Sequence, residues 1–193
     1  MQTTSPSKVN GVDTGALMKT VEAIQANPKI ATFQFRARNH LIDGGLNRSE
    51  IGEFHGALKE HRCGVEPFVL HNDEPAVLHS ADRAPNPVEY LLQALLACIT
   101  TTTTYKAAAH GIEIESIRSE VEGDIDLQGL LGLNPDVRPG FQEIRATLRI
   151  KAKDGVDDRI REFYKSSPVF DTLSNPVPVK VQVILEDEDR MAA

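Results

Sequence analysis

The longest apolar stretch of the chain lies between Asn86 and Gly111, and its spacing predicts a single long helix. Apolar and small side chains recur on more than one side of this helix, and no charged residue follows Glu89 until Lys106. Asn86 is expected to cap the helix, with Pro87 at its first position and Glu89 completing a capping box. Because a helix that is apolar on nearly all sides is buried, we expect the rest of the chain to pack around it.

Alternating apolar and polar positions predict strands on both sides of this helix. The expected strands cover residues 31–40, 51–59, 67–78 with a break at 72–75, 112–127, 141–151 and 177–185. The turn signal Asp43-Gly44-Gly45 predicts that the first two strands form a hairpin, with a loop longer than two residues. Shorter helices are expected over 13–27 and 156–166, the second ending at Ser167-Pro168. This order predicts an α+β fold in which helices cover largely antiparallel sheet.

Composition narrows the class of protein. The chain has 193 residues, which suits one domain, and residues 1–10 and 186–189 are expected to be frayed or solvated ends. Its net charge of −7 and pI of about 5.4 argue against a surface for nucleic acid or anionic membranes. The N-terminus has no basic segment followed by an apolar run, and the chain has only two cysteines. These features predict a cytoplasmic protein that binds neither nucleic acid nor membrane.

Cys98 lies in the middle of the long helix, where a cysteine most often serves as a small hydrophobic residue. A reactive thiolate at this position would need a cation from another element. Cys63 follows Arg62 in a polar link, where an unpaired loop cysteine is the expected state. Three histidines lie near Cys63 in the sequence: His61, His71 and His79. Together with Cys63, their spacing matches no compact zinc pattern. The sequence therefore predicts no metal site, and it carries no phosphate-loop or dinucleotide signature that would indicate a cofactor.

Two separated motifs resemble the OsmC/Ohr family of osmotically inducible and organic hydroperoxide resistance proteins. The first is Asn86-Pro87-Val88-Glu89-Tyr90-Leu91, followed by Ala97-Cys98 and by Ala109-His110-Gly111-Ile112; the second is Ser166-Ser167-Pro168-Val169 with Thr172-Leu173. The resemblance covers roughly residues 30–186. It implies an N-terminal arm with a short helix over 1–28, an OsmC-like domain over 29–189 and a tail at 190–193. It also implies antiparallel sheets around two central helices in an intertwined homodimer, with two sites at the subunit interface.

In peroxidase members of this family, the cysteine that matches Cys98 attacks a hydroperoxide, and an arginine and a glutamate polarise it. The resemblance assigns these roles to Arg38 and Glu89; Arg36 and Arg48 are alternative arginines, and the glutamate of the two-cysteine members falls at Val88 rather than at Glu89. On a straight helix, the separation of nine positions from Glu89 to Cys98 corresponds to roughly 13.5 Å along the axis and places the two side chains about 180° apart, so they could meet only across a dimer.

The family's second, resolving cysteine is replaced by Ser167, and a serine hydroxyl cannot resolve a sulfenic acid. An intramolecular disulfide is therefore unavailable, and an external thiol or Cys63 would have to complete the cycle. Two hypotheses follow. The first is thiol-dependent reduction of organic hydroperoxides through Cys98 in an oxidative-stress response. The second is a non-catalytic OsmC-like dimer that binds an apolar small molecule between its helices, with Cys98 as a structural residue.

Overall fold

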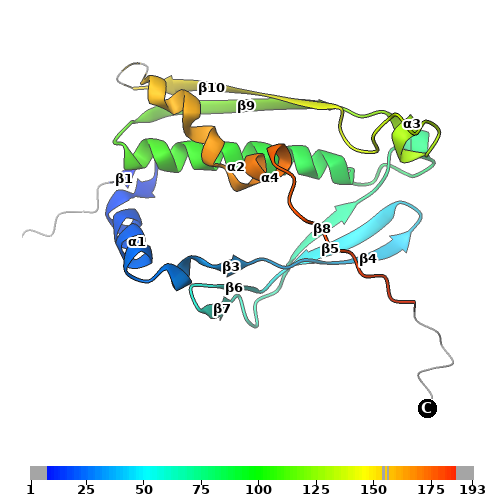
Figure 1. Ribbon diagram of the computed structural model, residues 1–193, viewed down its shortest axis with the longest axis horizontal. Coiled ribbons are helices and arrows are strands. Elements are labelled where there is room, and N and C mark those ends of the chain that lie inside the picture. The colour runs from blue at the N-terminus through cyan, green and yellow to red at the C-terminus, as the bar shows by residue number, and fades with distance from the viewer. Residues whose placement is uncertain (1–7, 154, 156, 186–193) are drawn as a thin grey trace, which may run out of the picture.

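The computed structural model describes residues 8–153, 155 and 157–185, and it is an α+β protein in which helix α2 lies beneath a long two-stranded ribbon (Figure 1). The strands are β1 (Lys8–Val9), β2 (Val12–Asp13), β3 (Phe33–Gln34), β4 (Arg38–Asp43), β5 (Leu46–Ile51), β6 (Phe54–Gly56), β7 (Lys59–His61), β8 (Phe68–Asn72), β9 (Ile114–Asp124) and β10 (Glu143–Ala152). The helices are α1 (Thr14–Ala26), η1 (Pro28–Ala31), η2 (Ala76–Leu78), α2 (Pro87–Ala109), α3 (Leu127–Leu130), η3 (Asp158–Ser166) and α4 (Pro168–Ser174), where η marks a 3-10 helix.

The ribbon of β9 and β10 confirms the strands expected after the long helix. The two strands are antiparallel, and their pairing runs from Asp124 opposite Glu143 to Ile114 opposite Ala152, with one irregularity before Ala152. Apolar residues at alternate positions of β10 face the helices, because side chains on a strand point alternately to its two sides. The outer face carries cross-strand ion pairs, including Arg149 with Glu120 at 2.6 Å. The alternation in the sequence thus separates a core face from a solvent face.

Helix α2 spans the expected residues, but in the single chain only one of its faces is buried. The buried residues recur nearly every four positions, as one face of a helix requires: Leu95, Ile99, Thr103, Ala107 and Ala108. The last turn packs against η3 in a core that joins Ala107, Ile160 and Phe163. Leu91 and Tyr105, on the same helix, are 36% and 48% exposed. Burial on nearly all sides is therefore not seen within one chain.

The strands before α2 differ from the expected pattern. The single strand expected over 31–40 is divided into β3, which pairs with β6, and β4, which pairs with β5, so that two small three-stranded sheets form, β3-β6-β7 and β4-β5-β8. The hairpin at Asp43-Gly44-Gly45 exists, but its loop has only two residues, because Asp43 already pairs with Leu46. Gly44 supplies the positive φ of +57° that such a tight turn needs. The prediction of a longer loop was wrong.

Two helical segments meet where the sequence predicted one helix and a stop. Residues 158–166 form a 3-10 helix, and Pro168 begins α4 instead of ending the helical structure. Ser167 is the N-cap of α4, and a proline is well tolerated at the first position of a helix. The Ser-Pro pair is thus a start signal as well as a stop signal.

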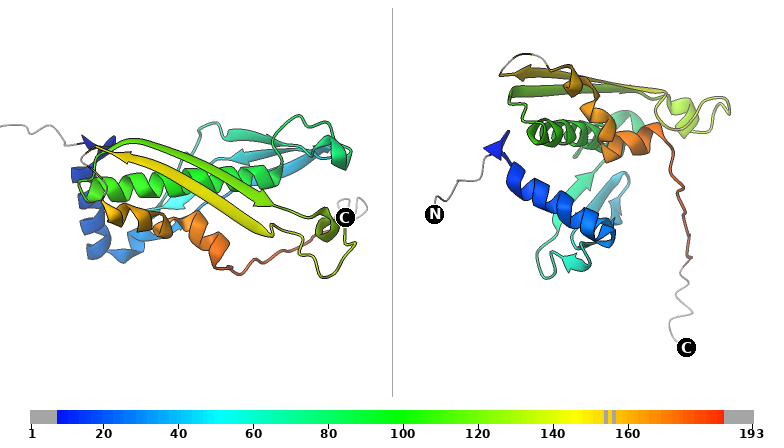
Figure 2. Two further views of the ribbon diagram at one scale, coloured as in Figure 1. Left: turned by 90° about the horizontal axis from the view of Figure 1, so that it is seen from above. Right: turned by 60° about the vertical axis from the view of Figure 1, so that its left-hand side comes forward.

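The two ends of the described chain also depart from expectation. Lys8–Val9 and Val12–Asp13 form a small hairpin, and the Asn10 side chain contacts both the carbonyl of Ile112 and the N–H of Ile114, at 2.9 and 2.7 Å. The segment 177–185 forms no strand; it is extended and exposed, and Figures 1 and 2 show it running away from α4. The expected tails at 186–189 and 190–193, like residues 1–7, lie outside the described residues.

Within the part of the chain that the structure describes, no helix combines the length and the apolar character needed to cross a bilayer.

Candidate functional site

The start of α2, which positions the candidate cysteine, is fixed by the expected capping box. The Asn86 side chain accepts a hydrogen bond from the N–H of Val88 at 2.9 Å, and the Glu89 carboxylate accepts one from the N–H of Asn86 at 2.8 Å. Both bonds satisfy backbone groups that the first turn leaves without helical partners. Glu89 therefore has a structural role in this chain, and its polarising role stays a prediction.

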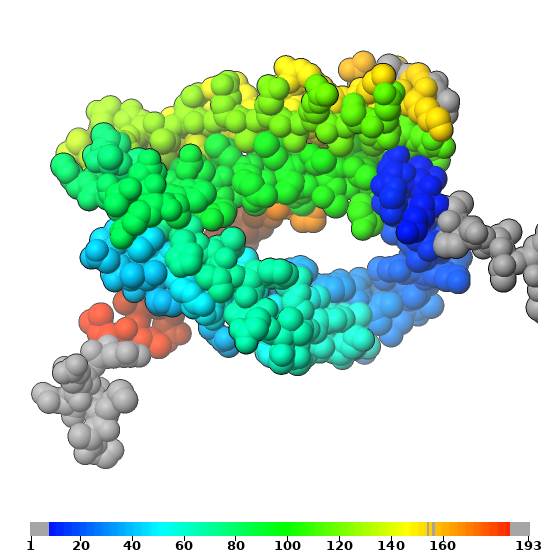
Figure 3. All heavy atoms as spheres, turned by 180° about the vertical axis from the view of Figure 1, so that it is seen from behind, coloured from blue at the N-terminus to red at the C-terminus, as the bar shows by residue number. Residues whose placement is uncertain are grey.

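Cys98 is half-buried and is a free thiol on α2. It lies seven residues from both Leu91 and Tyr105, so the three side chains share one stripe of the helix. Both neighbours are exposed in the single chain, and the space-filling view has an opening between the layer that contains α2 and the strands β3 and β6 (Figure 3). Cys98 thus borders a largely apolar surface that this chain does not cover.

A buried carboxylate that the sequence reasoning missed holds the loop leading into α2. Asp73 is 1% exposed and accepts hydrogen bonds from the Ser80 hydroxyl, from the Arg83 guanidinium at 2.9 Å and from the Arg83 N–H at 3.0 Å. These donors, that of Ser80 first, hold the pKa of Asp73 well below its usual range. The adjacent Glu74 contacts the Asn86 side chain, which links this loop to the helix cap. In the sequence, the only sign of this buried carboxylate was the acidic pair Asp73-Glu74 after a strand.

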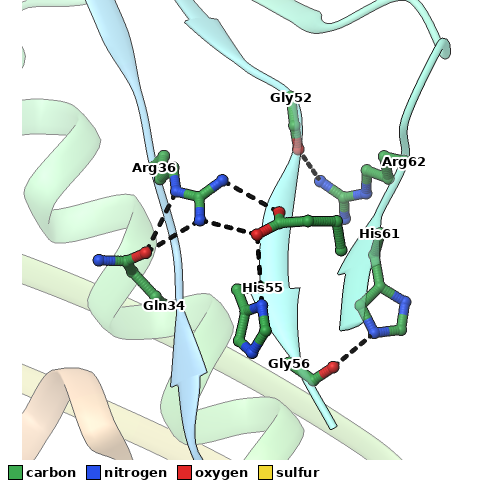
Figure 4. A network of polar contacts seen from close by, with 8 residues as sticks. Gln34, Arg36, Gly52, His55, Gly56, His61 and Arg62 are labelled. Carbon is green, nitrogen blue, oxygen red and sulfur yellow. Dashed lines mark hydrogen bonds and ion pairs between the residues drawn. The ribbon is translucent and has the colours of Figure 1, made fainter. Parts of the chain in front are cut away.

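The three arginines considered for the site are in different states. Arg36 pairs with Glu60 at 3.0 Å, and Gln34 and His55 complete the network (Figure 4). The Arg36 guanidinium lowers the pKa of Glu60. Arg48 pairs with Glu50.

Arg38 is exposed at the start of β4 and has no ion pair among the residues that the structure describes. Of the three, it is the arginine whose charge is not already engaged.

Ser167, which the resemblance matches to the family's second cysteine, is fully buried and acts as a helix cap. Its hydroxyl accepts a hydrogen bond from the N–H of Phe170 at 3.2 Å, and its own N–H donates to the carbonyl of Tyr164 at 2.9 Å. It therefore joins η3 to α4. Within the described ranges, no hydrogen bond or ion pair joins Cys98 to Arg38, Glu89 or Ser167.

Cys63 lies in an exposed turn, and the neighbouring cation is engaged elsewhere. The Arg62 guanidinium lies 5.1 Å from the ring centres of both Phe54 and Phe68. It also donates to the carbonyl of Gly52 at 3.4 Å (Figure 4). His61 stacks on Phe54 and contacts the carbonyl of Gly56. Among residues 8–153, 155 and 157–185, no three His, Cys, Asp or Glu side chains are grouped as a metal site.

A cavity of about 940 Å³ lies between α2, β10, η3 and α4. Its wall includes the buried face of α2 and the inner face of β10, but not Cys98. Leu91 lines this cavity and also belongs to the stripe that carries Cys98, so the cavity adjoins the surface around the candidate cysteine.

Comparison with known proteins agrees with the two motifs. The family model described as OsmC-like protein matches residues 79–182. This range runs from the loop before α2 into the extended segment after α4, and it includes both Cys98 and Ser167. A comparison with curated proteins finds no match.

Two solved structures with TM-scores above 0.5 share the fold at low sequence identity. The crystal structure of an OsmC-like protein from Mycoplasma pneumoniae is 20% identical, with a TM-score of 0.53 over 74% of this chain and 89% of that chain. A structural genomics structure is 13% identical, with a TM-score of 0.52 over 75% of this chain and 93% of that one. A Psychrobacter arcticus protein ascribed to osmotic stress and detoxification responses is 16% identical, with a TM-score of 0.46 over 70% of this chain and 83% of that one.

Proposed function

The chain belongs to the family of OsmC-like proteins, and from this premise we propose that it reduces organic hydroperoxides through Cys98, as part of an oxidative-stress response. The observation that carries the proposal is the setting of Cys98, a free thiol that is half-buried and lies on an open, largely apolar stripe of α2. A thiol in this position can be reached by a small molecule with an organic group, and the apolar surface favours that group over water.

The proposed cycle needs a thiol reductant from outside the chain. The Cys98 thiolate attacks the outer oxygen of the hydroperoxide, the O–O bond breaks, and the products are a sulfenic acid at Cys98 and an alkoxide that takes up a proton to become the alcohol. One external thiol then condenses with the sulfenic acid to give a mixed disulfide and water. A second thiol attacks that disulfide and restores Cys98. The serine at position 167 supports this route, because its hydroxyl caps α4 and cannot form a disulfide with Cys98.

Arg38 is the best candidate for the cation that activates Cys98. Its support is that Arg36 and Arg48 already pair with carboxylates, whereas no carboxylate of the described residues engages Arg38. A guanidinium beside the thiol would lower its pKa and stabilise the leaving alkoxide. In this proposal Glu89 orients the site from the capping box, and any direct polarising contact with Cys98 comes from a partner subunit.

We also propose that the working form is a homodimer. The open stripe of α2, with Leu91 and Tyr105 exposed, is a surface that a second copy would bury. The extended segment after α4 exposes large apolar side chains at alternate positions, as a strand without its sheet would: Val177, Val179, Val181, Val183 and Leu185. Analytical ultracentrifugation tests this: a dimer at micromolar concentration is expected, and a monomer throughout would contradict it.

The activity is tested by following loss of cumene hydroperoxide in the presence of a dithiol. We expect turnover by the wild-type protein and by Cys63→Ser, none by Cys98→Ser, and a slower reaction with hydrogen peroxide. Arg38→Gln should lower kcat/KM more than Arg36→Gln. Turnover that survives Cys98→Ser, or none in the wild type, would overturn the proposal.

The second candidate function is binding of an apolar small molecule, with Cys98 structural. One observation favours it, the cavity of about 940 Å³, whose size lies in the range of small-molecule sites. Because Cys98 is not part of its wall, ligand binding there and peroxide reduction at Cys98 can be tested separately.

A further inference from the structure

Cys98 has four side-chain neighbours on its own helix, because residues three and four positions apart meet on the surface of an α-helix. Ala94 and Leu95, on the N-terminal side, carry no polar side-chain atom. Thr101 and Thr102, on the C-terminal side, each carry a hydroxyl group. The side-chain hydrogen-bond donors that α2 itself provides next to the thiol are therefore these two threonines.

Thr102 is the better placed of the two to act on a molecule at Cys98. It follows Cys98 by four residues, which corresponds to roughly 6 Å along the helix axis. Side chains on a helix lean toward its N-terminus, so Thr102 leans over the turn that carries the thiol. Thr102 is half-buried, as Cys98 is, whereas Thr101 is exposed. A hydrogen bond is stronger where less water competes for it, which favours Thr102.

The Thr102 hydroxyl is not engaged within the protein. Three other threonines in helices donate to the carbonyl four residues earlier, at 3.1, 2.9 and 2.8 Å: Thr20, Thr104 and Thr172. For Thr102 the equivalent acceptor is the carbonyl of Cys98, and this bond is not formed. Among the described residues, the Thr102 hydroxyl has no hydrogen-bond partner, so it remains available to a molecule bound at the thiol.

The reaction at Cys98 needs a hydrogen-bond donor at the oxygen that leaves. When the thiolate attacks the outer oxygen of a hydroperoxide, an S–O bond forms and the O–O bond breaks. The electron pair of the broken bond stays on the oxygen that carries the organic group. This alkoxide is strongly basic, so a donor aimed at it lowers the barrier. Residues four apart on a helix have Cβ atoms roughly 5–6 Å apart, a gap that the two adjacent oxygens of a hydroperoxide can bridge.

We propose that the Thr102 hydroxyl donates a hydrogen bond to this leaving oxygen, which makes Thr102 a further catalytic residue. The inference rests on the proposed function, because it assigns a role in the same reaction at Cys98. Thr102 keeps its own proton, and the alkoxide takes up a proton from water. The role differs from that of Arg38, whose charge activates the thiolate. Because Thr102 and Cys98 share one helix, the contact needs no residue from a partner subunit.

Single-turnover oxidation of Cys98 in the Cys63→Ser protein, the parent here, tests the proposal with two oxidants. Cumene hydroperoxide releases a strongly basic alkoxide, whereas perbenzoic acid releases a carboxylate, which leaves without help. Thr102→Val, which keeps the branched shape, should slow cumene hydroperoxide about tenfold and perbenzoic acid less than about twofold. Thr102→Ser, which keeps the hydroxyl, and the control Thr101→Val should match the parent with both oxidants.

Three results would overturn the proposal. They are equal slowing of both oxidants by Thr102→Val, as a purely structural role would give, no slowing of either oxidant, and the same dependence on the leaving group in Thr101→Val. Failure of the proposed function gives a different result. In that case the parent itself reacts with cumene hydroperoxide no faster than a free thiol in solution, and both proposals fall.

Discussion

Replacing Ser167 with alanine should destabilise the protein, whereas replacing the neighbouring Ser166 with alanine should not. The Ser167 hydroxyl caps the N-terminus of α4, and its removal leaves the N–H of Phe170 without that acceptor. Loss of a serine cap costs about 1 kcal/mol, and a buried donor left unpaired raises the cost. Because Ser167 is fully buried, water cannot easily replace the hydroxyl. We expect a loss of about 1–2 kcal/mol.

Urea unfolding followed by circular dichroism measures this difference. For a chain of 193 residues, 1 kcal/mol corresponds to about 2–4 °C in Tm, so a thermal scan should agree. Ser166→Ala is the matched control, because Ser166 is exposed and precedes the cap. Measurements at several protein concentrations separate the cap from any change in association. Equal stability of Ser167→Ala and Ser166→Ala would refute the assignment of Ser167 as a cap.

Three further changes test the fold around the site. Leu58→Gly should stabilise the protein by about 1 kcal/mol in urea unfolding, because Leu58 has a φ of +65° in the tight turn between β6 and β7; no gain would contradict strain there. Gly56→Ala should lower the free energy of unfolding by about 1–3 kcal/mol, because the added Cβ would lie 2.2 Å from the Phe33 ring. An unchanged urea midpoint would contradict that packing. The wild type should have a larger free energy of unfolding than Asp73→Asn. This difference should be complete above pH about 4 and shrink as the pH falls, because the pKa of Asp73 is lowered in the folded state. A difference that does not change with pH would contradict the network.

The sequence predicted the elements whose signals are local. Asn86 and Glu89 identify the start of α2 because capping depends on residues within one turn, and the alternation of β10 records which side faces the core. The family resemblance rested on the same local motifs and is confirmed by the family model over residues 79–182.

The missed features depend on contacts between distant segments. Periodicity along 31–40 cannot tell that the chain passes from one sheet to another within that segment. Asp73 and Arg83 are ten residues apart and meet only because the loop folds back. The segment 177–185 has the alternation of a strand but no neighbouring strand in the single chain, because alternation predicts a side-chain pattern and not a partner.

The contacts around Cys98 remain predictions for a related reason. Arg38, Glu89 and Ser167 were selected because they match family motifs or share a strand face, and none of them is joined to Cys98 by a hydrogen bond or ion pair among the described residues. In the proposed homodimer, the partner subunit would supply contacts that a single chain does not contain. The free state of Arg38 is the structural feature that favours it over the other arginines.

The most direct test of the central claim is the rate at which Cys98 is oxidised by an organic hydroperoxide. Cys63→Ser protein, which keeps Cys98 as its single thiol, would be mixed with cumene hydroperoxide without reductant, and the sulfenic acid would be trapped and detected by intact mass. We predict fast, saturable oxidation at Cys98, slower oxidation by hydrogen peroxide, and a lower rate in the Arg38→Gln variant. Oxidation no faster than that of a free thiol in solution would contradict the account and leave Cys98 as a structural residue.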